Sequence, residues 1–137
     1  MKNQLIYPMA FYVVYMWGIG VLLFVSRVKA IKSGQISMKY FRAFSGAPPD
    51  ERTILIGRHY DNQFQVPLLF LICGALHFSM GNAHLSTLII AWTFILLRVV
   101  HSWIHLGANR VQKRAFFFIL SWFANLILWL QLLYFAL

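Results

Sequence analysis

The chain has 137 residues, which is room for a single domain. Hydrophobic residues make up 61% of it and charged residues 11%, whereas soluble domains average about 25% charged residues. This composition excludes an ordinary soluble domain and favours an integral membrane protein. The formal net charge is +9, but the basic residues lie between apolar runs. We therefore assign them to orientation in the membrane rather than to nucleic-acid binding.

The first apolar run predicts a membrane helix over about residues 5–28, long enough to cross a hydrocarbon core of ~30 Å. The run is too long for the core of a signal peptide and has no small-residue cleavage site, so we expect a retained helix. A basic loop follows from Lys29 to about Pro49. Asp50 is then a suitable N-cap for the next helix.

The second predicted helix covers residues 52–78 and has two unlike halves. Its first half is polar, and it becomes apolar only from Val66 onward. Pro67 is expected to kink this helix, because proline lacks the backbone N–H and crowds the preceding turn. Two further apolar runs, separated by a basic connection, predict helices over residues 85–106 and 114–137.

These four runs predict an all-α membrane protein, a four-transmembrane-helix bundle that forms one domain over residues 1–137. The first and third connections hold most of the basic residues, whereas only Lys2 lies on the opposite side. The positive-inside rule then places both connections in the cytoplasm and both termini on the non-cytoplasmic side. We expect a multi-pass protein of the inner (plasma) membrane.

Each of the last three predicted helices carries polar residues along one face, at helical spacings, near its cytoplasmic end. A charge within the hydrocarbon costs roughly 2.5–3.5 kcal/mol, so such faces must contact protein or water. Together they predict a basic pocket, open to the cytoplasm, that suits an anionic ligand. We assign Ser121 and Asn125 to interhelical hydrogen bonds and the arginines to the pocket. The residues are Arg58, Asn62 and Gln65; Arg98, His101, Ser102, His105 and Asn109; and Arg114, Ser121 and Asn125.

Two further residue types were weighed as reactive or metal-binding groups. His101 and His105 are four residues apart, a spacing that could bind a metal, but no cysteine or acid nearby completes a ligand set. We therefore favour structural hydrogen bonding and predict no metal site. Cys73 lies in an apolar run, where a thiol is not activated, and is expected to be a packing residue.

Two stretches carry a resemblance to the MAPEG family, the membrane-associated proteins in eicosanoid and glutathione metabolism, and to its small bacterial type in particular. Residues 58–67 read Arg-His-Tyr-Asp-Asn-Gln-Phe-Gln-Val-Pro and are similar to the family's Arg-x3-Asn-x2-Glu followed by Pro. Residues 98–105 read Arg-Val-Val-His-Ser-Trp-Ile-His and are similar to its Arg-x2-(His/Tyr)-x3-Tyr. Two positions differ from the family pattern: Gln65 stands in place of the Glu and His105 in place of the Tyr.

The resemblance implies a homotrimer that binds glutathione as cosubstrate between subunits, near the cytoplasmic face. It implies a transferase or peroxidase acting on a lipophilic small molecule that membrane lipid delivers. Arg114, or alternatively Arg110, is the catalytic residue that would hold the thiolate. The alternative is a non-catalytic lipid-binding scaffold of the same family, which the lost charge at Gln65 favours. A small transporter is less favoured, because the chain lacks an acidic relay. The implied glutathione-binding residues are Arg58, Asn62, Gln65, Arg98, His101, His105 and Arg110.

Overall fold

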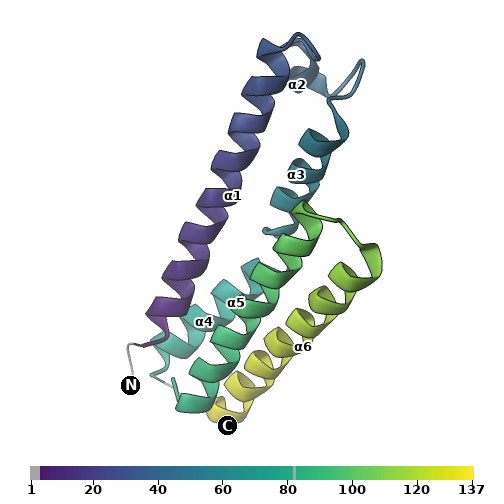
Figure 1. Ribbon diagram of the computed structural model, residues 1–137. Helices are drawn as coiled ribbons and strands as arrows, with labels where there is room; N and C mark the ends of the chain where they lie inside the picture. The colour runs from purple at the N-terminus through teal and green to yellow at the C-terminus, as the bar shows by residue number, and fades with distance from the viewer. Residues whose placement is uncertain (1–3, 82) are drawn as a thin grey trace.

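The computed structural model describes residues 4–81 and 83–137, so Lys2 lies outside the described residues. All regular structure over this part of the chain is helical, as predicted (Figure 1). The helices are α1 (Ile6–Lys32), α2 (Tyr40–Ala43), α3 (Glu51–Asn62), α4 (Val66–Ser79), α5 (Leu85–Leu106) and α6 (Val111–Ala136).

The chain passes four times along the long axis of the molecule (Figure 1). Helix α1 runs its full length, α3 and α4 return together, α5 turns back and α6 follows it down, so the first and last helices begin and end at the same end. Helix α6 packs chiefly on α5 and also on α4, while α1 packs chiefly on α3. Among the described residues, only α1, α5 and α6 are each long and apolar enough to cross a membrane.

The predicted helix over residues 52–78 is wrong as a single element, because the structure divides it into α3 and α4. Pro67 lies at the start of α4, where its missing N–H costs no hydrogen bond, so it begins a helix instead of kinking one. The side-chain amide of Gln63 donates to the carbonyl of His59 at 2.8 Å and so satisfies a carbonyl at the end of α3.

Other helix bounds also differ from the prediction, whereas the range 85–106 has the same bounds as α5. Helix α1 continues to Lys32, and lysines in its last turn interact favourably with the helix dipole. The predicted basic loop contains the short α2. Helix α6 begins at Val111 rather than at 114, so Arg114 lies within its first turn.

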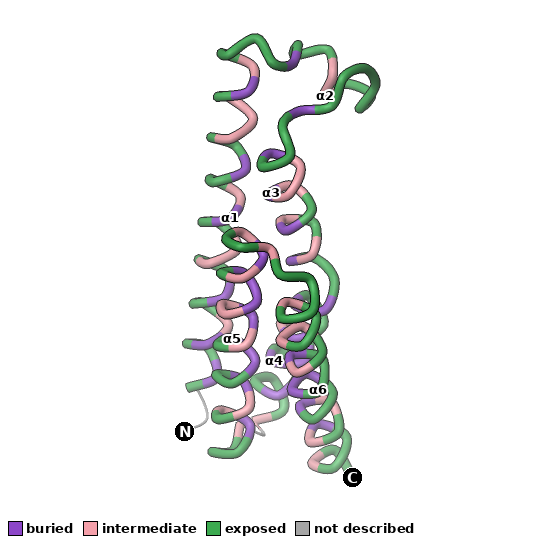
Figure 2. Tube along the Cα trace, turned by 45° about the vertical axis from the view of Figure 1, so that its right-hand side comes forward, coloured by how far each residue is buried: buried purple, intermediate pink, exposed green. Residues whose placement is uncertain are grey.

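The apolar core lies between α1, α4, α5 and α6, towards the end at which α6 finishes (Figure 2). Phe70 and Phe94 stack there with ring centroids 4.4 Å apart, and Tyr12 lies 5.9 Å from both rings. The hydroxyl of Tyr12 points away from this core to Gln63. The aromatic core therefore supports a polar layer, which is formed where α3 meets α5.

Candidate functional site

The polar layer is built around Arg98, whose side chain is fully buried on α5. Its Nη2 donates to Oδ1 of Asn62 at 3.1 Å and to Oε1 of Gln63 at 3.4 Å. The guanidinium also lies over the ring of Phe118 on α6, 5.6 Å from its centroid. The two sequence stretches 58–67 and 98–105 therefore meet at this arginine.

Gln63 links α1, α3 and α5 through its side-chain amide, although its position in the sequence does not single it out. Its Oε1 accepts the hydroxyl of Tyr12 at 2.6 Å as well as the contact from Arg98. Its Nε2 lies 3.2 Å from Nε2 of His59. One signal could have identified this residue, because Ile56, His59 and Gln63 follow the i, i+3, i+7 spacing of a buried helical face.

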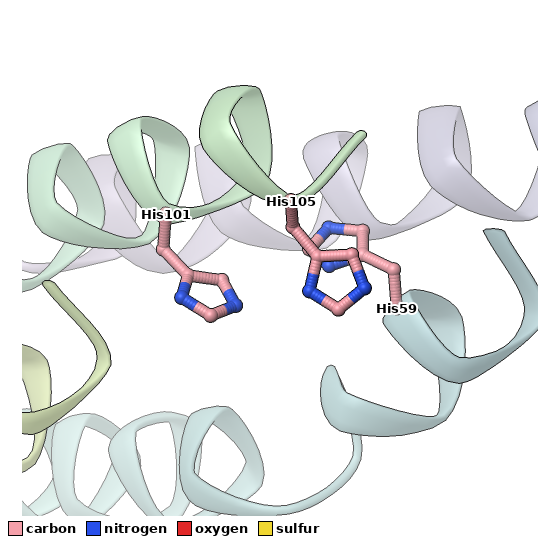
Figure 3. A group of neighbouring side chains, drawn as sticks. All are labelled: His59, His101 and His105. Atoms are coloured by element: carbon pink, nitrogen blue, oxygen red, sulfur yellow. The ribbon is translucent and has the colours of Figure 1, made fainter. Parts of the chain in front are cut away.

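Three buried histidines lie beside this amide. His59 projects from α3, and His101 and His105 project from α5 into the same space (Figure 3). The ring centroids of His59 and His105 are 4.8 Å apart, and those of His101 and His105 are 5.6 Å apart. Nδ1 of His101 donates to the backbone carbonyl of Arg114 at 2.8 Å. This bond fixes the orientation of the His101 ring and connects α5 to the start of α6.

Arg114 is half-buried in the first turn of α6. Its Nη1 donates to Oδ1 of Asn109 at 2.6 Å. Asn109 has a φ of 46° and lies in the left-handed region, which asparagine tolerates better than most residues. The turn thus holds the Arg114 guanidinium near the end of α5 that carries His101 and His105.

Comparison with protein families tests the family membership that residues 58–67 and 98–105 suggest. A profile of the MAPEG family matches residues 5–134, nearly the whole chain. The chain belongs to the MAPEG family. Comparison with curated proteins and with solved structures gave no significant match. MAPEG membership and the three long apolar helices together indicate an integral membrane protein, and they are consistent with a glutathione-related function at the membrane.

The residues carried over from the MAPEG motifs fall into two groups in the structure. Arg98, His101 and His105 are buried next to α3, and Asn62 and Arg114 are half-buried beside them. The other three are exposed, so the described chain does not gather the whole predicted set. They are Arg58, Gln65 and Arg110.

Residues outside the MAPEG motifs complete the polar layer. The hydroxyl of Tyr15 on α1 donates to Oγ of Ser102, which in turn donates to the carbonyl of Arg98 at 2.8 Å. Ser121 donates to the carbonyl of Phe118 at 2.7 Å, within its own helix, and makes no interhelical hydrogen bond with the residues that the structure describes. Asn125 is buried, and its Oδ1 has no hydrogen-bond partner among the described residues.

Two apolar grooves lie on the surface of this MAPEG chain. One, of about 550 Å³, lies along α1, α3 and α4 and includes Trp17, Tyr60 and Phe64 in its wall. The other, of about 350 Å³, lies between α4 and α6 and includes Trp122 and Asn125. Neither groove is lined by the arginines of the polar layer, so the apolar and basic surfaces of the described chain are separate.

Proposed function

We propose that the chain is a glutathione-dependent membrane transferase or peroxidase that acts on a lipophilic electrophile. The observation that carries the proposal is the buried guanidinium of Arg98. Its Nε and Nη1 have no hydrogen-bond partner among the described residues, and its hydrogen bonds to Asn62 and Gln63 are to neutral amides. An arginine remains charged in a protein, and a buried unpaired charge is costly, so this site favours the arrival of an anion.

Glutathione fits such a site because it carries two carboxylates and a thiol. Asn62 is half-buried and is the side chain through which a ligand at the surface would reach the Arg98 network. Arg58 lies one helical turn away on the same face of α3 and is exposed. Its guanidinium would bind a carboxylate through two parallel hydrogen bonds.

The thiol requires a cation of its own, and we assign this role to Arg114. A neighbouring cation stabilises the thiolate, which is the nucleophilic form of the thiol. In a transfer, the sulfur forms a bond to the electrophilic carbon while the leaving group departs with its electron pair. In a peroxidase reaction, two glutathione thiols are oxidised to a disulfide and the hydroperoxide is reduced to an alcohol and water. Arg110, which is exposed at the start of α6, contributes a second charge at the same end.

A membrane assembly would bring the exposed residues into the site. Helices α3 and α4 have 12 and 14 residues, about 18 Å and about 21 Å, so neither alone crosses a core of ~30 Å. We propose that they form the fourth span together, with the first and third connections in the cytoplasm. In a homotrimer, a neighbouring subunit would cover Arg58 and Gln65, and glutathione would bind between subunits.

The apolar grooves supply the other half of the reaction. Both grooves face outward and are lined mainly by apolar side chains, so lipid and lipophilic molecules would enter them from the bilayer. A conjugation assay tests the proposal: the detergent-purified protein should accelerate the reaction of glutathione with a lipophilic aryl halide. An Arg114→Ala variant serves as the matched control.

The alternative is a non-catalytic, lipid-binding scaffold. The observation that favours it is Gln65, which lies exposed in the break between α3 and α4 and carries no charge for the ammonium group of glutathione. Turnover that is indistinguishable between the wild-type protein and the Arg114→Ala variant would favour this reading.

A further inference from the structure

The three histidines of the polar layer are close enough to act on one ion. One ring nitrogen of each of His59, His101 and His105 lies within 4.8 Å of the others. All three side chains are buried, at 0%, 3% and 6% exposed. Nδ1 of His59 and Nε2 of His101 have no hydrogen-bond partner among the described residues, and His105 interacts only with the backbone of Leu55, outside good hydrogen-bond geometry. Buried imidazole nitrogens are normally hydrogen-bonded, so this arrangement calls for a ligand.

We propose that His59, His101 and His105 form a binding site for a divalent transition metal of the zinc type. His101 and His105 are four residues apart on α5, the spacing that places two imidazoles on one metal in zinc-binding helices. The prediction of no metal site rested on the lack of a third ligand, and His59 on α3 now supplies it (Figure 3). Three histidines leave a fourth position open, as in catalytic zinc sites.

The cluster needs only a small closure to reach ligand geometry. Zinc–nitrogen bonds of about 2.0–2.1 Å place the nitrogens of a tetrahedral site about 3.4 Å apart. Rotation of the His59 and His105 rings about their side-chain bonds can bring their nitrogens closer to Nε2 of His101, whose ring is held by its bond to the Arg114 carbonyl. His101 already has the form of a metal ligand, because Nδ1 donates to the carbonyl of Arg114 and leaves Nε2 with its lone pair.

The tautomer of His59 couples the proposed metal to Gln63. The Gln63 amide donates to Nε2 of His59 at 3.2 Å, which places the His59 proton on Nδ1. A metal bound at Nδ1 would move that proton to Nε2. The Gln63 group that faces Nε2 would then have to accept a hydrogen bond instead of donating one. Turning the amide by 180° presents Oε1 to Nε2–H of His59 and gives up the bond from Gln63 to the His59 carbonyl. Tyr12 can then accept from the amide, because a phenol both donates and accepts, and Arg98 keeps its bond to Asn62.

The surrounding charges determine what fills the open position. No carboxylate belongs to the cluster, and the charges of Arg98 and Arg114 act on its histidines. A dication bound by three neutral imidazoles beside two guanidiniums is favourable only with an anionic fourth ligand. We assign hydroxide to this position in the absence of other anions. This inference goes beyond the proposed function, because it needs no glutathione and assigns His101 and His105 to a metal.

Cobalt(II) titration of the full-length, chelator-treated protein in detergent, without glutathione, tests the proposal. We expect one Co²⁺ per chain with the intense visible bands of tetrahedral coordination, which added Zn²⁺ abolishes. His101→Gln and His105→Gln should each lower affinity by more than about 100-fold, the upper range for loss of a supporting residue. His84→Gln is the matched control, because His84 is exposed at the other end of α5, and it should bind like the wild type.

A second variant separates a metal site from a loss of folding. Gln63→Glu supplies a carboxylate acceptor for Nε2–H of His59, and it should tighten Co²⁺ binding by about 10-fold. X-ray absorption of the wild-type Zn²⁺ form should show three imidazoles in the first coordination shell. A wild-type protein that binds no tetrahedral Co²⁺ would overturn the proposal. So would a folded His101→Gln variant that retains the wild-type spectrum.

Discussion

Nη2 of Arg98 on α5 donates to Oδ1 of Asn62 on α3 at 3.1 Å. This contact joins residues 36 positions apart and connects the two stretches that resemble MAPEG motifs. It leaves the rest of the guanidinium without a partner among the described residues.

Arg98→Met should weaken glutathione binding and at the same time raise the melting temperature in detergent. The variant removes a positive charge, worth about 1.5–3 kcal/mol in a charge-assisted bond and so roughly 10- to 100-fold in affinity. It also replaces a buried charge lacking an acidic partner by an apolar side chain, which is often stabilising. Calorimetry and thermal unfolding measure the two effects. A lower melting temperature with unchanged binding would assign Arg98 a purely structural role.

Arg114→Ala should affect the thiol more than the binding of glutathione. The ultraviolet absorbance of the bound thiolate should fall, because the cation that stabilises the ionised sulfur is gone. Difference spectra at saturating glutathione measure this. Arg110→Ala is the matched control, since Arg110 is exposed at the start of the same helix, and its thiolate absorbance should change less. A larger loss in Arg110→Ala would transfer the role to that residue.

Gln65→Glu should tighten glutathione binding by roughly 10- to 100-fold, because a carboxylate at this position would pair with the ligand's ammonium group. The position is exposed, so the new charge carries little folding penalty. Gln65→Leu, which offers no acceptor, is the control and should bind more weakly than the wild type. Abolished binding in Gln65→Glu would show that the ligand lies elsewhere.

The first connection should be cytoplasmic and the second should lie on the opposite side. Ser37 and Met80 are exposed in these two connections and can each be replaced by cysteine in a Cys73→Ala background. A membrane-impermeant thiol reagent added to intact cells should label position 80 and spare position 37. The opposite labelling pattern would reverse the orientation.

Much of the fold follows from apolar run length, which predicts helices at the positions of α1, α5 and α6. The division between α3 and α4 cannot be predicted from apolar run length, because a proline within an apolar run is compatible with either a kink or a new helix. The side chain of Gln63 helps to end α3 by bonding back to His59. That bond depends on the three-dimensional environment of the amide, which the sequence pattern does not reveal.

The sequence predicted only part of the candidate site, and the reason for the gap is similar. The spacing of Arg98, His101 and His105 identified one buried face of a helix. Gln63 and His59 lie on a different face of α3 from Arg58. A prediction based on the charged face therefore missed the face that is buried. Helical periodicity gives the faces of a helix, whereas packing against the neighbouring helix selects the face that is buried.

Calorimetric titration of glutathione into the detergent-purified wild-type protein tests the central claim most directly. We predict saturable binding at millimolar glutathione or below that is weakened in Arg98→Met and strengthened in Gln65→Glu. Absence of any binding heat from a folded wild-type protein at millimolar glutathione would contradict the proposed function.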